Sequence, residues 1–365
     1  MKKILIVSNM YPSEKFYSYG IFVKRFCEQL EMIGVRYNLC VMKKNENTFF
    51  KIINYIIFFI KSFISYFNKE NELIYIHYAS HSSIPIILAH KLFKKNIYVN
   101  VHGSDIVPEN KKQQLFQKYT KKILSIADKV VVPSEYFKEY LGKKYNIKPN
   151  KIIVYPSAGI NANVFNVKKT DRNVLKEQFN IKKDIYIFGY VGRISSKKGW
   201  DIFLRATKIL YEKRQDFQVV IVGEGKEEQK MNDLIKKLKI HNLVRLPLLS
   251  QEDLCKIYNC FDCFVFPTMR EGESLGLVGL ESMACGCPVI SSDFAAPKYY
   301  VNSLNGLKFE KGNFYDLADK MNTFMNYSKQ KIEDLKNGAV KTASEYYIEN
   351  IIDILKGIVG DFYEG

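Results

Sequence analysis

Two successive sets of short apolar runs limit the fold of this chain more than any other feature of its sequence. Each run is six or seven residues long and is followed by a longer segment with helical spacing. The first set occupies residues 3–8, 73–78, 96–101, 129–134 and 151–156, and the second occupies residues 186–192, 217–223, 243–249, 263–268 and 288–293. Strands that alternate with helices indicate parallel βαβ units, and continuous apolar runs indicate strands covered on both faces. The sequence therefore predicts an α/β protein with two doubly wound, Rossmann-like domains.

The domain boundaries follow from a polar stretch, residues 166–184, that separates the two sets of runs. A length of 365 residues also exceeds what one hydrophobic core usually supports. We expect an N-terminal domain over 1–165 and a C-terminal domain over 166–340. The last stretch, 341–365, has helical spacing and no strand after it, and we expect it to pack back on the N-terminal domain. Ligands of such sheets bind beyond the carboxyl ends of the strands, so the cleft is expected there.

The seven cysteines form no even framework, and the first apolar run is too short for the core of a signal peptide. Both features favour a reducing compartment with free thiols. The five cysteines between 255 and 287 stand at apolar positions or in a turn, so we interpret them as structural. His77 and His81 have helical spacing but lie at a strand end, and we interpret them as structural too. No metal site is expected.

The net charge of +17 is concentrated in residues 1–165, which hold 25 Lys and Arg against 11 Asp and Glu. A positive face suits nucleic acid or an anionic membrane. No nucleic-acid recognition motif accompanies the charge, and the aromatic-rich stretch 49–67 favours membrane. Its uncharged run Ile52–Ile60 is too short to span a bilayer. Two interpretations stay open for this stretch: a helix at the membrane interface, or a helix packed on the core with snorkelling Lys51 and Lys61.

The segment REGESLGLVGLESMACGCPVI, residues 270–290, carries the strongest functional signal. It predicts a Gly-containing loop and then a helix that begins near Gly276, whose free N–H groups and dipole suit an anion or a sugar hydroxyl. Glu273 lies in the loop and Glu281 about two turns later, so helical rotation places both carboxylates toward one ligand. The alternative is a capping acid and a solvated helix acid.

A second segment, GYVGRISSKKGW at 189–200, follows a predicted strand with a glycine turn. Gly192 permits close backbone approach, and the cations Arg193 and Lys198 would clamp a diphosphate without a metal. The alternative is a basic surface turn. A third segment, VGEGKEE at 222–228, is another strand exit, and a plain turn explains it by itself.

The order of these segments resembles that of the family 4 retaining glycosyltransferases, which have the GT-B fold of two Rossmann-like domains that face a central cleft. The resemblance covers the whole chain. In the N-terminal half it rests on YPSEKFYSYGIFVKRFCEQL (11–30), on VHGSDI (101–106) and on VVVPSEYFKEYL (130–141).

The resemblance implies a set of site residues. Glu273 and Glu281 match a pair that serves the transferred sugar and the ribose, and Arg193 and Lys198 match the diphosphate-binding pair. The remaining matched positions are Gly20, Leu275, Gly276 and Leu277 as donor-binding residues, and His102 near the reacting centre. Gly192 and Ser274 are expected to contact the donor as well. The alternative is that His102 is a buried histidine that only holds its loop in place. Ser274 departs from the family, which usually has Gly there, and LPLLS (246–250) lacks a glycine often found at that place.

The resemblance implies a retaining, metal-independent hexosyltransferase without a cofactor. The expected donor is a nucleotide-diphosphate sugar, most simply a UDP-sugar, and the expected acceptor is a hydroxyl of a glycan or lipid-linked sugar, as in the synthesis of capsule or lipopolysaccharide. We expect a cytoplasmic protein, peripheral at the inner face of the cytoplasmic membrane. Two alternatives stay open: a nucleotide-sugar-binding protein without turnover, and a GT-B epimerase or phosphorylase.

Overall fold

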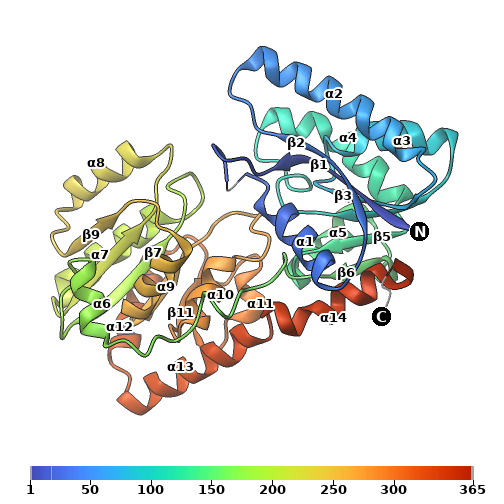
Figure 1. The fold of residues 1–365 in the computed structure, drawn as a ribbon. Helices are drawn as coiled ribbons and strands as arrows, with labels where there is room; N and C mark the ends of the chain where they lie inside the picture. Colours follow the sequence, from blue (N-terminus) through green and yellow to red (C-terminus); the bar gives the residue numbers. More distant parts are fainter. Residues whose placement is uncertain (1, 18, 363–365) are drawn as a thin grey trace. The chain divides into compact units, whose positions relative to one another are not determined.

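The computed structural model describes residues 2–17 and 19–362, which fold into two compact units (Figure 1). The N-terminal unit comprises the described residues up to Ala158 and again from Ile351 onward, and the C-terminal unit comprises Gly159–Asn350. Each unit contains one parallel sheet with helices on both of its faces. The predicted α/β, doubly wound architecture is therefore confirmed in both units.

The N-terminal unit has a six-stranded parallel sheet in the order β2-β1-β3-β4-β5-β6. The strands are β1 (Lys3–Tyr11), β2 (Tyr37–Lys43), β3 (Asn71–His77), β4 (Asn96–Asn100), β5 (Lys129–Val132) and β6 (Ile152–Val154). The helices are α1 (Ile21–Met32), α2 (Thr48–Tyr66), α3 (Ser83–Leu92), α4 (Lys111–Ile126), α5 (Glu135–Tyr145), α14 (Ile348–Val359) and the 3₁₀ turns η1 (Pro149–Lys151) and η2 (Gly360–Phe362).

Strand alternation divides the core of the N-terminal unit into two layers. In β1, Ile4 and Ile6 enter the layer beneath α1 and α14, whereas Leu5 and Val7 enter the layer beneath α2 to α5. All four side chains are buried, as expected of a strand covered on both faces. The apolar run at the start of the chain is thus a central strand.

The C-terminal unit has a second six-stranded parallel sheet, in the order β12-β11-β10-β7-β8-β9. The strands are β7 (Tyr186–Val191), β8 (Phe217–Val222), β9 (Leu243–Leu246), β10 (Cys263–Phe266), β11 (Val289–Ser292) and β12 (Gly306–Phe309). The helices are α6 (Arg172–Gln178), α7 (Trp200–Lys213), α8 (Glu228–Leu238), α9 (Gln251–Cys260), α10 (Leu277–Ala284), α11 (Pro297–Tyr300), α12 (Phe314–Met325) and α13 (Lys329–Ser344).

The same alternation builds the core of the C-terminal unit. In β7, Ile187 and Val191 pack with residues of α9, α10 and α13, whereas Phe188 and Tyr190 pack with residues of α7, α8 and α12. The central strands β7 and β10 carry the two segments with the strongest functional signals, and they are hydrogen-bonded neighbours. Their carboxyl ends therefore bring those two segments to one place.

Each sheet has one strand more than the sequence predicted, and both extra strands lie at a sheet edge. The strand β2 has several residues that are only partly buried, and β12 has only four residues, of which Leu307 and Lys308 are partly buried. The apolar run of β2 is only four residues long, at 39–42, and Lys308 interrupts that of β12. Both are shorter than the runs of six or seven residues from which the other strands were predicted.

The observed boundary between the units falls at Ala158 and not at residue 165. The reason is that Ile160 and Phe165 are buried in the core of the C-terminal unit, and Ile160 also forms a bridge with Tyr347. The chain re-enters the N-terminal unit at Ile351, about ten residues later than residue 341, because the first part of the expected last stretch belongs to α13. Residues 363–365 of that stretch lie outside the described residues.

The helix α14 completes the N-terminal unit. Its buried residues Ile351, Leu355 and Ile358 lie in the same cluster as Ile4 and Ile6 of β1. The end of the chain thus covers part of the sheet that the beginning of the chain starts.

Two helical glycines provide a matched test of this packing. A Cβ added at Gly338 in α13 would lie 1.9 Å from the carbonyl oxygen of Leu304, whereas one added at Gly357 in α14 would meet nothing within 4 Å. We expect Gly338→Ala to lower the free energy of unfolding by roughly 1–3 kcal/mol through overpacking. Gly357→Ala should raise it by roughly 0.5–1 kcal/mol through helix propensity. Urea unfolding of both variants measures the two changes in the free energy of unfolding. Stabilisation by Gly338→Ala would contradict the close packing of α13.

Candidate active site

The candidate site of the C-terminal unit is built from three loops at the carboxyl ends of neighbouring strands. The loops follow β7, β8 and β10, and they contain the three segments GRISSKKG, GEGKEE and EGESLG. The sheet order β10-β7-β8 places the loop after β7 between the other two. The topology of the sheet thus assembles three pieces that are far apart in the sequence.

The loops after β7 and β10 are held together at backbone distance. The N–H of Met269 donates to the carbonyl of Lys197 at 2.8 Å. Gly199, with φ of +79°, caps α7, and a Cβ added there would lie 1.8 Å from the carbonyl oxygen of Pro267. Only glycine combines this left-handed conformation with so close a contact.

The loops after β7 and β8 are joined in the same way. The N–H of Ile194 donates to the carbonyl of Glu224 at 2.9 Å, and the N–H of Glu227 donates to the carbonyl of Ile194 at 3.1 Å. Added Cβ atoms at Gly223 and Gly225 would lie 2.2 and 2.1 Å from carbonyl oxygens of the β7 loop. The glycines of VGEGKEE therefore permit close loop packing, which a plain turn would not require.

An ion pair lies where the loops after β7 and β10 meet. The Lys198 ammonium donates to a carboxylate oxygen of Glu273 at 2.7 Å, and the Thr268 hydroxyl donates to the same oxygen at 3.0 Å. The Lys198 side chain is 18% exposed and that of Glu273 is 9% exposed. The sequence predicted both charged residues at the site, but it did not predict their direct contact or the role of Thr268.

The environment of Glu273 keeps its carboxylate charged. Burial alone would raise the pKa of Glu273, but the charges of Lys198 and Arg270 and the hydrogen bonds from Lys198 and Thr268 hold the pKa below its usual value. A charged carboxylate with Lys198 and Thr268 on one oxygen is well suited to accept hydrogen bonds from ligand hydroxyls.

The helix α10 begins directly after this ion pair. Its N-cap is Gly276, with φ of +78°, and no side chain caps the helix, so first-turn N–H groups remain for an incoming group. Leu275 is buried in the core and anchors the loop, while Leu277 and Ser274 are partly buried beside it. The predicted start of this helix near Gly276 is confirmed.

The predicted helical rotation from Glu273 to Glu281 is wrong, because Glu273 is not part of the helix. Glu273 lies in the loop, and α10 begins only at Leu277, so Glu281 is about one helical turn inside the helix and not two. Glu281 is mostly buried, and its charge contributes to a raised pKa of Tyr258, whose main cause is burial. Glu273 therefore lies in the loop and Glu281 in the helix that follows it. Helical geometry alone does not determine the direction of one carboxylate relative to the other.

Arg193 differs from Lys198 in exposure. Gly192 follows β7 directly, with its N–H bonded to the carbonyl of Val222, and Arg193 comes next with an exposed side chain. Within the described residues Arg193 makes no salt bridge. Lys198 is thus held by a carboxylate of the protein, whereas the Arg193 guanidinium faces solvent.

The matched residues of the N-terminal unit also lie at a carboxyl edge. Gly20, with φ of +76°, caps α1, and a Cβ added there would lie 2.5 Å from the backbone of Met10 just before the end of β1. Phe22 in the first turn of α1 lies against His102, with 4.0 Å between ring centroids. The structure therefore brings the Gly20 turn and His102 together within this unit.

His102 is fixed by two contacts that the sequence did not reveal. Its Nε2 lies 3.0 Å from Nδ1 of His77, and its backbone N–H donates at 3.0 Å to the buried carboxylate of Asp105. Asp105 also accepts from the N–H groups of Gly103 and Ala79. His77 lies at the end of β3, so the interpretation of His77 as only structural overlooked its contact with His102.

Burial controls the protonation of both histidines. It lowers the pKa of His102 to about 3, and it lowers the pKa of His77 well below its usual value, with a further contribution from His102. Both rings are therefore neutral near pH 7, and one of them donates the hydrogen bond that joins them.

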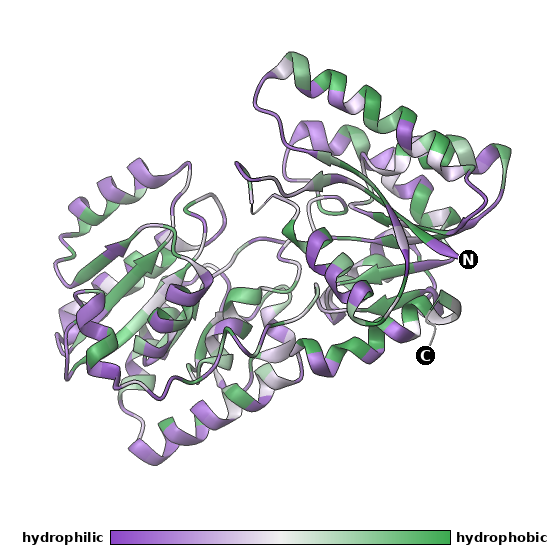
Figure 2. Cartoon of the chain, in the orientation of Figure 1, coloured by the Kyte–Doolittle hydropathy of each residue, from purple (hydrophilic) through white to green (hydrophobic). Residues whose placement is uncertain are grey.

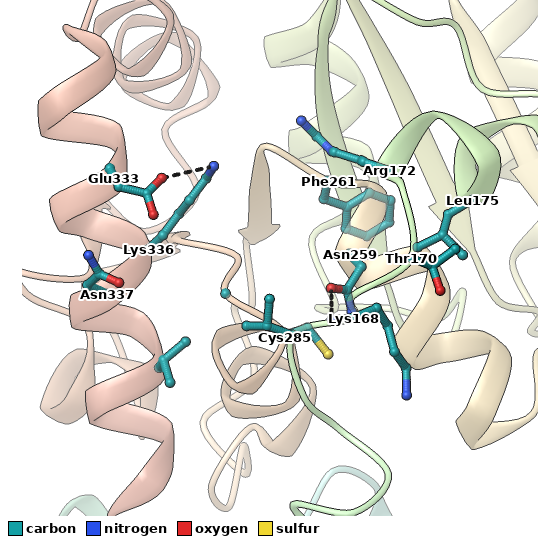
Figure 3. Close-up of a pocket in the computed structure, with 13 residues that line it drawn as sticks. Lys168, Thr170, Arg172, Leu175, Asn259, Phe261, Cys285, Glu333, Lys336 and Asn337 are labelled. Atoms are coloured by element: carbon teal, nitrogen blue, oxygen red, sulfur yellow. Dashed lines mark hydrogen bonds and ion pairs between the residues drawn. The ribbon is translucent and has the colours of Figure 1, made fainter.

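The C-terminal unit also contains a pocket of about 280 Å³ (Figure 3). It is lined by Arg172 and Leu175 of α6, by Asn259 and Phe261 before β10, and by Glu333 and Lys336 of α13. The helix α6 and the end of α9 precede the amino ends of β7 and β10, whereas ligands of doubly wound sheets bind beyond the carboxyl ends. The pocket is therefore separate from the candidate site.

The described cysteines are all free and buried. Across residues 2–17 and 19–362, no three His, Cys, Asp or Glu side chains form a group that could hold a metal ion.

Comparison with known protein families agrees with this geometry. Residues 22–158 match the model of glycosyltransferase family 4, and residues 171–342 match the model of glycosyl transferases group 1. The chain belongs to the family 4 glycosyltransferases. The two matches together cover both units, as the resemblance in both halves of the sequence predicted.

Curated relatives agree with this assignment, and solved structures show the same fold. The capsular polysaccharide biosynthesis glycosyltransferase CapM of Staphylococcus aureus is 28% identical over 240 residues, which are 65% of this chain and 62% of CapM. The matched stretch spans between 55 and 66% of the length of the first three curated relatives. Sucrose-phosphate synthase from Thermosynechococcus elongatus has a TM-score of 0.79 at 17% identity and covers 100% of this chain and 99% of that one. Anabaena HepE in complex with UDP has a TM-score of 0.77 at 16% identity, covering 99 and 100% of the two chains. The predicted GT-B fold is confirmed.

A double-mutant cycle tests the ion pair. We expect Lys198→Met to cost about 3 kcal/mol of stability because it leaves a buried carboxylate uncompensated, and the cycle with Glu273→Gln should give a coupling of about 1–3 kcal/mol. The exposed pair Lys143–Glu139 is the matched control and should give less than about 0.5 kcal/mol.

The same pair makes stability depend on pH. Because the pKa of Glu273 is lowered in the fold, its contribution to the free energy of unfolding is present above the unfolded carboxyl pKa and is lost as pH falls below it. Urea unfolding at pH 7 and pH 4 measures both effects, and a coupling no larger than that of the control would contradict them.

A second test concerns the neutral histidine pair. The unfolded chain binds protons on these histidines below about pH 6.5 while the folded chain does not, so stability should fall as pH falls from 7 toward 4. We expect His102→Asn to lose less stability over this range than the wild type. His241→Asn, at an exposed histidine of the C-terminal unit, is the control and should keep the wild-type pH slope. Thermal unfolding at pH 7 and pH 5 provides the comparison, and equal slopes for all three proteins would show that His102 is not held neutral.

Proposed function

We propose that this chain is a retaining glycosyltransferase that moves a sugar from a nucleotide-diphosphate donor to a hydroxyl of a glycan or lipid-linked acceptor. The observation that carries the proposal is the Lys198–Glu273 pair at the start of α10, beside the uncapped helix terminus at Gly276. One place thus offers a cation and N–H groups for a diphosphate, and a carboxylate for sugar hydroxyls.

We propose a role for each of the individual residues. The exposed Arg193, Lys198 and the first N–H groups of α10 would stabilise the charge that grows on the departing phosphate. Glu273 would accept hydrogen bonds from the transferred sugar, and Glu281 would accept them from the ribose. Gly20 and His102 are proposed as donor-binding residues of the N-terminal unit, with the His102 ring as a neutral hydrogen-bonding group.

Retention is proposed to proceed by attack of the acceptor hydroxyl from the face that the phosphate leaves. The bond from the acceptor oxygen to the anomeric carbon forms, the bond from that carbon to the phosphate oxygen breaks, and the phosphate takes the hydroxyl proton. The Lys198 ammonium and the Thr268 hydroxyl already occupy one oxygen of Glu273, which favours a hydrogen-bonding role over a nucleophilic one. We propose that no metal is needed, because Arg193, Lys198 and the helix terminus already supply positive charge.

A UDP-sugar is the proposed donor, since HepE, a protein of the same fold, has been solved with UDP and with UDP-glucose. The name of CapM supports an acceptor in the synthesis of a surface polysaccharide.

The test is donor hydrolysis followed by mass spectrometry with UDP-, GDP- and ADP-sugars in the presence of EDTA. We expect release of one nucleotide, at least about 100-fold slower in Glu273→Gln because an interaction with the reacting sugar is lost. Arg193→Gln should lower kcat more than it changes KM, because its charge acts mainly on the departing phosphate. The control Glu252→Gln changes an exposed acid of α9 and should match the wild type. Once an acceptor is found, proton NMR of the product reports the anomer, and an inverted product would overturn retention.

The same experiment separates the alternatives. Nucleotide binding without release from any donor, and without transfer, would favour a binding protein. Release of a sugar phosphate when inorganic phosphate is added, without an acceptor, would favour a phosphorylase. Interconversion of two UDP-sugars would favour an epimerase.

A further inference from the structure

We propose that α2, together with α3 and the basic helix α4, forms a docking surface for an anionic lipid bilayer. The inference starts from α2, which has two apolar sides. One side is buried and includes Phe58, Ser62 and Tyr66, which are spaced by four residues and pack on the N-terminal unit. The opposite side faces solvent, and it too is almost entirely apolar.

The exposed side of α2 is a stripe along the whole helix. The exposed fractions are 67% for Phe49, 54% for Ile56, 55% for Ile60 and 64% for Ile64. At 100° per residue these four positions fall within about 80° of one another around the helix axis. Single exposed apolar residues are ordinary, but a continuous stripe on a monomer marks an interaction site.

The neighbouring helix also exposes apolar side chains. The helix α3 packs on α2, and its end exposes Leu88 and Leu92, with Phe93 directly after it. The exposed fractions of these three side chains are 52, 72 and 56%. Figure 2 shows much of α2 and α3 in the green of apolar residues. The apolar surface therefore spans two helices on one face of the sheet and is named here the α2–α3 face.

The charges around this face have one sign. The helices α2, α3 and α4 contain eight lysines and no Asp or Glu, and α4, which packs on α3, contributes five of the lysines. Lysines beside an apolar stripe are the pattern of a helix that lies in the interface of an anionic bilayer. A second copy of the chain would bring like charges together, so charge complementarity favours a lipid surface over self-association.

The fold favours a helix that lies on the membrane over one that crosses it. By length and composition α2 is apolar enough to span a bilayer. However, its two ends lead into β2 and β3, which are both paired with β1 in one sheet. Its buried side is also fixed, since the Tyr66 hydroxyl donates to the carbonyl of Phe93 and lies 2.9 Å from Nδ1 of His90. Insertion across a bilayer would break these contacts and separate the strands.

Vesicle co-sedimentation of the full chain tests the proposal. The probes are vesicles of phosphatidylcholine alone and vesicles with phosphatidylglycerol. We expect binding to the anionic vesicles, weaker by at least about fivefold on the neutral ones and reduced by 0.5 M salt. The triple variant Ile56→Gln, Ile60→Gln, Ile64→Gln should lower the partition coefficient at least about tenfold, because it removes apolar surface that would enter the interface.

Two further variants complete the test. The control Val174→Gln, Leu304→Gln, Tyr315→Gln changes three exposed apolar residues of the C-terminal unit and should bind as the wild type does. Replacement of Lys118, Lys121 and Lys122 by Gln should remove most of the preference for anionic vesicles. Circular dichroism and unfolding midpoints verify that each variant is folded.

Three outcomes would overturn the proposal. One is equal binding of the Ile triple variant and the wild type, and another is no preference for anionic lipid. The third is a wild-type dimer that the Ile triple variant converts to a monomer without loss of vesicle binding. The assay contains no nucleotide-sugar, so its result is independent of whether the proposed sugar transfer is correct.

Discussion

The candidate site depends on the ion pair between Lys198 and Glu273. Each residue lies on a loop after a different strand, and neither loop contains regular structure that would fix it alone. The charge pair joins the loops through their side chains, and the hydrogen bond from Met269 to Lys197 joins them through their backbones. The start of α10 follows this junction directly, so the helix terminus is held in place by the same contacts. A buried, charged pair of this kind is costly to form unless hydrogen bonds complete it, and Thr268 supplies one of them.

Glycine sets how closely the loops approach. Around the junction, Gly199 and Gly223 lie at positive φ with a neighbouring carbonyl where a Cβ would be. A side chain at either place would push two loops apart and move the charged groups that they carry. The three loops therefore need these glycines in order to pack against one another, whether or not a ligand is bound.

The sequence predicted every central strand of the two sheets, but it missed two of the four edge strands. The covered strands β1 and β7 have long apolar runs because both of their faces are buried, and such runs can be read directly. The edge strands β2 and β12 depend on pairing with one neighbour, which leaves little trace in their composition. At the site, residue types at the ends of strands predicted Glu273, Lys198 and the start of α10. Contacts between distant residues, such as His77 with His102, depend on which strands are adjacent and were not predictable from spacing.

The return of the chain to its first unit has a consequence for synthesis. Ile351, Leu355 and Ile358 of α14 belong to the same core layer as Ile4 and Ile6 of the first strand. On the ribosome, the C-terminal unit, Gly159–Asn350, is continuous and can fold as soon as it has emerged. The N-terminal unit begins earlier, yet its sheet keeps one apolar face partly uncovered until residues 351–359 are made. The part of the protein that is translated first is therefore completed last, and during that interval its exposed strands depend on other means of avoiding aggregation.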